Sequence, residues 1–529
     1  MSIIRRMKLH SISNRRVVMV HCLVGLLTLG LLFATVHNRD TTTPDFGKGP
    51  EAAGRFDARW NDLSDHWRED GWWANGGMYY LNQCDWFKRA KGGSLSIWLG
   101  DQAEDSEAKP EDSEAKQYFY RSNTMLFLAP LHVAQSVTVQ LAGGTSRPWV
   151  MVLYSQIITM MTAVLLGLSG TMLARNMKIR WGHALVLGLT SQIVLETTPI
   201  NLDAYWGFYM QHAFALPLTG LLLSFIWPNP RARRWIRTTA VIGLFLADLP
   251  HAVLLIIGLA LLNLVIDHRL FRYQRWGRSV LLPAAIGLAV IGIQYGIVLA
   301  GTDRHEFVGS SLFFRTGLDG GTKYFQSLWD GALGFIFESN LQPGAHAPAT
   351  SRVLWIAGSI AAIGVLLIGT WQRRGSRLCY ALAILAMAFI PFFLLFPNAV
   401  AIHPYAYPVI ALPLTVLALF TALPLAMTIF ARRSWPLVLL ALLGGMTLTM
   451  ANLRDYVIAR PIDVESLLLK LPGLTSAQAT DHLGGTPPTH ESAAHFTVDA
   501  HISIDHGRDR TLSRNSAGPV NAVLHNSAT

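Results

Sequence analysis

The residues best suited to chemistry gather in one polar stretch near the start of the chain, Asp62–Leu81 (DLSDHWREDGWWANGGMYYL). It contains four acids, one histidine, one arginine, five aromatic residues and three glycines. Aromatic rings at a membrane surface often form only an interfacial belt. Rings can also stack on a sugar, while a nearby carboxylate takes the proton of an acceptor hydroxyl. The acids favour this second interpretation, which predicts sugar chemistry.

The composition decides what kind of element must position these residues. Of 529 residues, 51% are apolar and only 14% are charged, against about 25% in an ordinary soluble domain. This excludes a soluble enzyme and a disordered chain, and three cysteines exclude a disulfide-knit secreted domain. The net charge of +10 comes from short basic clusters between apolar runs, as in membrane proteins, and predicts no nucleic-acid partner. We therefore expect an all-α polytopic membrane protein.

Eleven apolar runs are candidate membrane spans, since a span needs about 20 apolar residues. They are 17–36, 149–174, 182–200, 211–228, 238–249, 251–267, 279–301, 353–371, 378–397, 405–430 and 435–451. Five basic residues precede the first run, which predicts a cytoplasmic N-terminus. This run is longer than the apolar core of a signal peptide, so we expect an uncleaved anchor.

The basic clusters all fall on the cytoplasmic side only if 238–267 crosses the membrane twice, turning at Asp248–His251. This turn is then predicted to lie at the outer surface. The chain then divides into a basic N-terminus (1–16), a first span (17–36), an outer loop with the candidate acid (37–148), spans two to seven (149–301), a second outer loop (302–352), spans eight to eleven (353–451) and a polar, disordered tail (452–529). The predicted location is a cell inner (plasma) membrane, with the C-terminus extracytoplasmic.

Four short segments resemble the GT-C superfamily of membrane glycosyltransferases, which use polyprenyl-phosphate sugars. The segments are Glu69–Trp73 (EDGWW), Tyr120–Thr124 (YRSNT), Leu244–Leu262 (LFLADLPHAVLLIIGLALL) and Ala401–Leu412 (AIHPYAYPVIAL). The layout of residues 1–451 is also similar to that family. In it, a first span precedes a large outer loop that carries an essential acid and interfacial helices.

The resemblance implies sugar transfer from a polyprenyl-phosphate donor to an extracytoplasmic acceptor at the bilayer surface, with Asp70 as general base beside Glu69. The leaving phosphate needs fixed cations, and we expect these among Arg121, Arg304, His305, Arg315 and Lys323. The other predicted substrate-binding residues are Trp72, Trp73, Tyr79, Tyr120, Asp203, His403 and Tyr405. No cofactor is firmly implied, although a divalent metal is compatible with the reaction.

Two other functions remain open on the sequence. A flippase or transporter of lipid-linked saccharide would show matching halves with broken helices. The sequence shows no such repeat, and few acids lie inside the spans. A ligase or polymerase of the O-antigen type would rely on arginines and histidines of a late loop. Replacing Asp70 by Asn separates these alternatives from the glycosyltransferase hypothesis.

Overall fold

The structure of the chain is a computed structural model that describes about half of the residues. These are residues 2–36, 64–65, 67–68, 80–82, 117–120, 126–143, 148–198, 201–202, 210–266, 277–301, 305–308, 324–330, 376–402, 410, 413–420, 422 and 435–459. All of them belong to one structural unit, formed by residues 1–37 and 41–460. The apolar run 353–371 and residues 460–529 of the predicted tail lie outside the described residues, whereas residues 452–459, predicted as the start of a disordered tail, belong to a helix that ends at Ala459.

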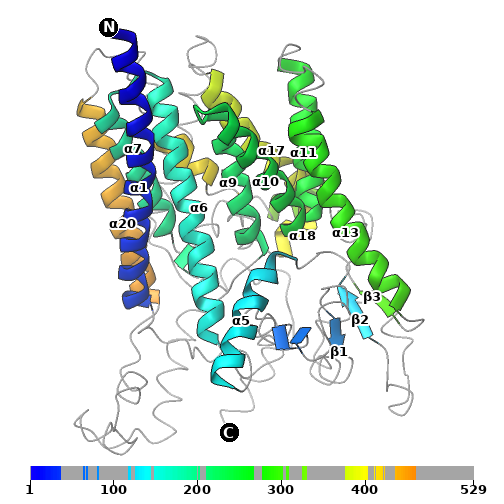
Figure 1. The fold of residues 1–529 in the computed structure, drawn as a ribbon. Coiled ribbons are helices and arrows are strands. Elements are labelled where there is room, and N and C mark those ends of the chain that lie inside the picture. The colour runs from blue at the N-terminus through cyan, green and yellow to red at the C-terminus, as the bar shows by residue number, and fades with distance from the viewer. Residues whose placement is uncertain are drawn as a thin grey trace, which may run out of the picture. The chain divides into compact units, whose positions relative to one another are not determined.

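The described part of the chain is predominantly helical (Figure 1). Its helices are α1 (Ser2–Val36), α5 (Ala129–Ala142), α6 (Pro148–Asn176), α7 (Trp181–Glu196), α9 (Met210–Ile226), α10 (Pro230–Ala247), α11 (Leu249–Ile266), α13 (Leu282–Gly301), α17 (Ser376–Leu395), α18 (Pro397–Ile402) and α20 (Trp435–Ala459). Three described helices are long and apolar enough to cross a membrane, within Arg15–Leu32, Leu153–Asn176 and Arg278–Ile297. These three helices support the membrane character of the protein. The apolar stretches of the other described helices are shorter.

The apolar run 238–267 folds as two helices rather than one. Helix α10 starts after Asn229, whose side chain accepts hydrogen bonds from the backbone N–H groups of Arg231 (2.9 Å) and Ala232 (3.2 Å). It ends at Ala247, because Asp248 is extended (φ −155°, ψ 102°), and α11 starts directly afterwards. The side of the membrane on which this turn lies stays a prediction. The Asp248 side chain is buried, since α9 and α17 pack over the turn.

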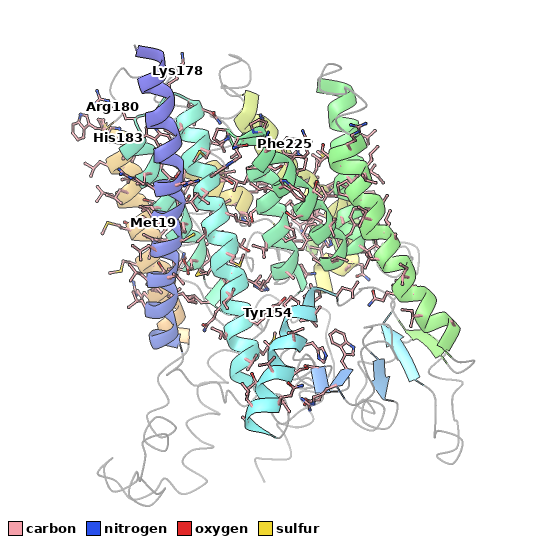
Figure 2. All side chains as sticks on the ribbon, viewed as in Figure 1. Met19, Tyr154, Lys178, Arg180, His183 and Phe225 are labelled. Carbon is pink, nitrogen blue, oxygen red and sulfur yellow. The ribbon has the colours of Figure 1, made fainter. Side chains whose placement is uncertain are left out.

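Helix α6 packs against α7, α9 and α1. Close approach of α6 and α7 depends on Gly167 and Gly188, because a Cβ atom on Gly188 would lie 2.5 Å from the Gly167 carbonyl oxygen. His21 of α1 completes this junction. Its Nδ1 pairs with Gln192 Oε1 at 2.6 Å and its Nε2 with Thr171 Oγ1 at 3.0 Å. On α1, side chains such as Met19 stay exposed and form an apolar surface suited to lipid (Figure 2).

A small three-stranded sheet departs from the all-α expectation. Strand β2 (Gln117–Tyr120) pairs antiparallel with β1 (Tyr80–Asn82) and parallel with β3 (His305–Val308). Strands of three or four residues are too short for an alternating pattern to be recognised in a sequence. In addition, β3 is separated from the other two by most of the helices, so nothing local predicts the pairing.

Candidate functional site

Most of the predicted site residues lie outside the described part of the chain. These are Glu69, Asp70, Trp72, Trp73, Tyr79, Arg121, Asp203, Arg304, Arg315, Lys323, His403 and Tyr405. Tyr120 is described as the last residue of β2, and His305 as the first residue of β3. The described residues next to them nevertheless show which segments of the chain are held together.

The segment that leads to the candidate general base is attached to α5. Ser64 Oγ lies 3.2 Å from His132 Nδ1, and the Trp67 ring meets the His132 ring edge-on at 5.4 Å. Trp67 is only 1% exposed, and Arg68 pairs with Asp65 at 2.7 Å. Burial, together with the charge of Arg68, lowers the pKa of His132, although the hydrogen bond with Ser64 opposes the shift. A neutral His132 thus anchors the chain two residues before Glu69 and three before Asp70.

Helix α5 is in turn attached to α6. The Tyr154 hydroxyl of α6 donates a hydrogen bond to the backbone carbonyl of Phe127, in the short 3₁₀ turn Leu126–Leu128 that precedes α5 (Figure 2). Phe127, Leu128 and Leu131 are buried in the same core as Trp67. The first loop is therefore fixed to the N-terminal end of α6 through side chains on both sides of α5.

The sheet joins the two predicted outer loops through the pairing of β2 with β3. Tyr120 pairs with Val308 at one end of β2 and β3, and Gln117 pairs with His305 at the other. A strand rises about 3.3 Å per residue, so these ends are about 10 Å apart. In the sequence, Arg121 directly follows Tyr120 and Arg304 directly precedes His305. The two arginines therefore adjoin opposite ends of this pairing.

The second outer loop is also attached to the late helices. The Tyr324 hydroxyl donates to the Leu394 carbonyl of α17 at 2.6 Å, and Ser327 Oγ lies 3.3 Å from Asn398 Oδ1 of α18. Lys323 directly precedes Tyr324, and His403 directly follows the end of α18. Lys323 and His403, which are predicted to bind the phosphate or the acceptor, are therefore each next in sequence to an element of this contact.

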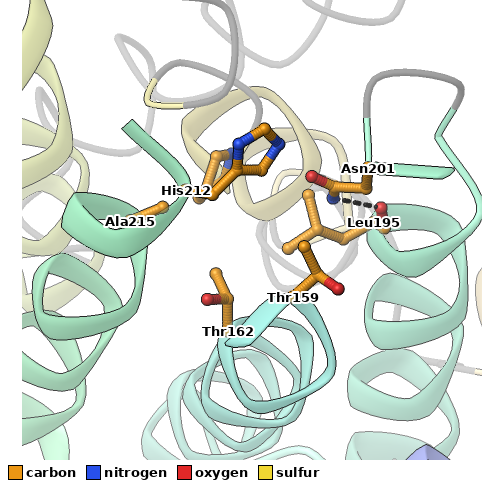
Figure 3. A pocket seen from close by; sticks show the side chains of 7 residues that line it. Thr159, Thr162, Leu195, Asn201, His212 and Ala215 are labelled. Carbon is orange, nitrogen blue, oxygen red and sulfur yellow. Dashed lines mark hydrogen bonds between the residues drawn. The ribbon is translucent and has the colours of Figure 1, made fainter. Parts of the chain in front are cut away.

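A pocket lies between the C-terminal end of α7 and the N-terminal halves of α6 and α9 (Figure 3). Its empty space, including the mouth, is about 210 Å³. It is lined by Thr159, Thr162, Leu195, Asn201, His212, Ala215 and Pro413. The predicted ligand Asp203 lies in the short connection between two lining residues, Asn201 and His212.

The pocket combines an apolar floor with two polar groups. The hydroxyls of Thr159 and Thr162 donate to carbonyls of their own helix, Ser155 O at 3.1 Å and Ile158 O at 2.8 Å. Asn201 Nδ2 donates to Leu195 O at 2.7 Å, which turns the amide oxygen toward His212 (Figure 3). The space inside it that can take the centre of a water molecule is about 10 Å³, enough for about one water, so the described pocket is too small to enclose a sugar ring.

Asp248 and His251 form a second buried polar pair beside this region. His251 Nδ1 lies 2.8 Å from Asp248 Oδ2, and the His251 backbone N–H donates to Asp248 Oδ1 at 3.3 Å. The imidazole stacks on Phe392 of α17 at 3.7 Å and contacts Phe214 of α9 at 5.5 Å. This pair therefore joins α9, α11 and α17, with the carboxylate orienting the imidazole.

Sequence reasoning missed several polar residues of the interior. Glu196, Asn201 and His212 were not predicted, yet all three are buried at or next to the pocket. Glu196 carried a usable signal, because it is the single acid in the apolar run 182–200. Within the described residues, no group of three or more His, Cys, Asp or Glu side chains is arranged to hold a metal ion.

Comparison of the chain with models of protein families, with curated proteins and with solved structures finds no significant match. The function is therefore argued from the residues and their geometry.

Proposed function

We propose that this chain is a membrane glycosyltransferase that moves a sugar from a polyprenyl-phosphate carrier to an extracytoplasmic glycan, lipid or protein acceptor. The observation that carries the proposal is the attachment of the segment before Asp70 to α5, through the contacts of Ser64 and Trp67 with His132. The predicted ligand Asp203 lies two residues after Asn201, which lines the small pocket between α6, α7 and α9.

In the proposed reaction, the Asp70 carboxylate takes the proton of an acceptor hydroxyl as the acceptor oxygen bonds to the anomeric carbon of the donor. The bond between that carbon and the carrier's phosphate oxygen breaks, and the polyprenyl phosphate leaves with the electron pair. Arg121, Arg304 or Lys323 would stabilise the charge on the phosphate. The attachment of Ser64 and Trp67 to α5 supports a positioned carboxylate, because it fixes the chain just before Asp70.

The proposal includes a topology. We propose about eleven spans in a GT-C-like bundle in the inner (plasma) membrane, with a cytoplasmic N-terminus and an extracytoplasmic C-terminus. Under this topology the C-terminal end of α7 and the N-terminal ends of α6 and α9 face outward. The pocket, the first loop and the sheet then share the side on which a polyprenyl-phosphate sugar would present its headgroup.

The experiment is Asp70→Asn, with Asp65→Asn as its matched control. Asp65 lies in the same segment and forms a partly exposed ion pair with Arg68, which contributes little to stability. We expect Asp70→Asn to abolish the glycoconjugate that depends on this protein and Asp65→Asn to retain it, at equal expression and membrane localisation. A full glycan level in Asp70→Asn would refute the assignment of the base.

One observation favours a second candidate, a transporter of lipid-linked saccharide. Glu196 is a buried acid within an apolar helix, and such residues often belong to ion or substrate pathways. A transporter needs no general base, so it would tolerate Asp70→Asn. The same variant therefore separates the two functions.

A further inference from the structure

Glu196 stands out among the polar residues that the proposed reaction does not use. It is the last residue of α7 and only 2% exposed. Neither of its carboxylate oxygens has a hydrogen-bond partner among the described residues. An ionised carboxylate in such surroundings is strongly destabilised, whereas a neutral carboxylic acid is tolerated.

The helices packed against α7 provide no compensating charge. These are α6, α20 and α1. No Asp, Glu, Lys or Arg occurs in residues 148–174 of α6, 435–453 of α20 or 17–36 of α1. Arg175 lies at the opposite end of α6 from the part that meets the end of α7, and the side chain of Arg454 on α20 is exposed.

The other titratable groups on these helices are already bonded elsewhere. His21 of α1 is held by Gln192 and Thr171, and the Tyr154 hydroxyl of α6 donates to Phe127 O. His183, on α7 itself, lies more than three turns from Glu196. None of these groups neutralises the carboxylate.

The neighbouring helices bury a donor and an acceptor that lack partners within the described part of the chain, and the donor is Asn452 Nδ2 of α20. Gln156 Oε1 on α6 is a buried acceptor without a partner among the described residues. A protonated carboxyl adds one O–H donor to this interior, whereas an ionised carboxylate only adds acceptors. A neutral acid therefore removes a buried charge and can still both donate and accept, which suits an acceptor such as Gln156 and a donor such as Asn452.

We propose that Glu196 is a proton-binding site, held as the neutral acid while α7 is packed against α6, α20 and α1. A rearrangement that separates these helices would expose the carboxyl to water and release one proton. The site would thus couple the opening of this end of α7 to proton exchange. This inference does not depend on the proposed glycosyl transfer.

The first test is infrared spectroscopy of the full-length protein in lipid nanodiscs at neutral pH. We expect the wild-type spectrum to contain the C=O stretching band of a protonated carboxylic acid, and Glu196→Gln to lack that component. Gln is the matched variant, because it keeps the size and polarity of the side chain but binds no proton. Equal far-ultraviolet circular dichroism of the two proteins controls for folding.

A second measurement assigns the proton to the residue. Dicyclohexylcarbodiimide enters membranes and reacts with protonated carboxyls. The acid proton moves to one carbodiimide nitrogen, the carboxyl oxygen bonds to the central carbon, and the acyl group then migrates to nitrogen without loss of atoms. We expect mass spectrometry with fragmentation to locate this adduct on Glu196 itself, and a water-soluble carbodiimide to leave Glu196 unmodified.

An infrared band lost in Glu196→Gln, or the adduct on Glu196, supports the proposal. Absence of both signals would overturn it, as would ready modification by the water-soluble reagent. Neither measurement reads glycosyl transfer, so a failure of this inference is distinguishable from a failure of the proposed function.

Discussion

Replacing Gly188 by Ala tests the contact between α6 and α7 most directly. A Cβ atom at this position would lie 1.9 Å from Thr171 Oγ1 and 2.5 Å from the carbonyl oxygen of Gly167. Ordinary contact begins near 3.4 Å, so the Thr171 hydroxyl would have to rotate away and the two helices would have to separate by about 0.9 Å at the Gly167 carbonyl. The same movement would stretch the hydrogen bonds by which Thr171 and Gln192 hold His21.

The expected loss of stability follows from three terms. Overpacking of a close contact costs about 1–3 kcal/mol. Weakening one or two interhelical hydrogen bonds adds about 0.6 kcal/mol each in a membrane protein. Alanine recovers about 0.5–1 kcal/mol of helix preference relative to glycine. The net destabilisation by Gly188→Ala is therefore about 1–3 kcal/mol.

Gly182→Ala is the matched control on the same helix. A Cβ atom at Gly182 meets nothing within 4 Å, so this change gains helix preference without a clash. The two variants should differ by about 2–4 kcal/mol when purified protein is unfolded in mixed micelles with increasing sodium dodecyl sulfate. Equal unfolding midpoints for Gly188→Ala and Gly182→Ala would refute the packing described for α6 and α7. In addition, Gly188→Ala should lower the stability less when Thr171 is also replaced by Ala. That second change removes Thr171 Oγ1, the atom nearest to the new Cβ.

Two further predictions concern histidines. His21→Ala removes both side-chain bonds to Gln192 and Thr171 and should destabilise the protein by about 1–3 kcal/mol in the same unfolding assay. Thr28→Ala should change little, since the Thr28 hydroxyl bonds only within α1, and a His21→Ala protein as stable as Thr28→Ala would contradict the junction. For His132, a pKa lowered by burial from its ordinary 6.5 means that the folded protein favours the neutral ring. The resulting stabilisation is complete above pH 6.5 and is lost as the pH falls through the lowered pKa of the folded protein. Hydrogen exchange of residues 64–68, corrected for intrinsic rates, should therefore accelerate toward acidic pH in wild type more than in His132→Gln, and equal pH dependence in both would refute the role of His132.

Much of the helical structure follows from local sequence. Apolar runs of 17 or more residues predict helices because a helix satisfies its own backbone hydrogen bonds, which a membrane interior requires. Asn229 and Pro230 predict the start of α10, and the break at Asp248 separates α10 from α11 where the sequence suggested a turn. The three-stranded sheet was not predictable, because its strands pair across long distances in the chain.

Part of the candidate site can likewise be predicted from the sequence, and part of it cannot. The acids and aromatic residues around Asp70 are recognisable by type and spacing, and their role stays a prediction. The pocket at Asn201 and His212 was not recognisable, since its lining comes from α6, α7, α9 and the segment at Pro413. A turn at Asp248 was expected from the sequence, but its burial by helices distant in the chain was not.

By itself, the sequence determined that this is a helical protein of membrane character, because hydropathy and helix length depend only on consecutive residues. The tertiary structure alone decided that Gly188 meets Thr171, that His132 holds Trp67, and that Glu196 has no partner among the described residues. The physical reason is that the energy of a polar or closely packed side chain depends on which distant helix faces it. Such partners are set by three-dimensional packing and leave no periodic signal along the chain.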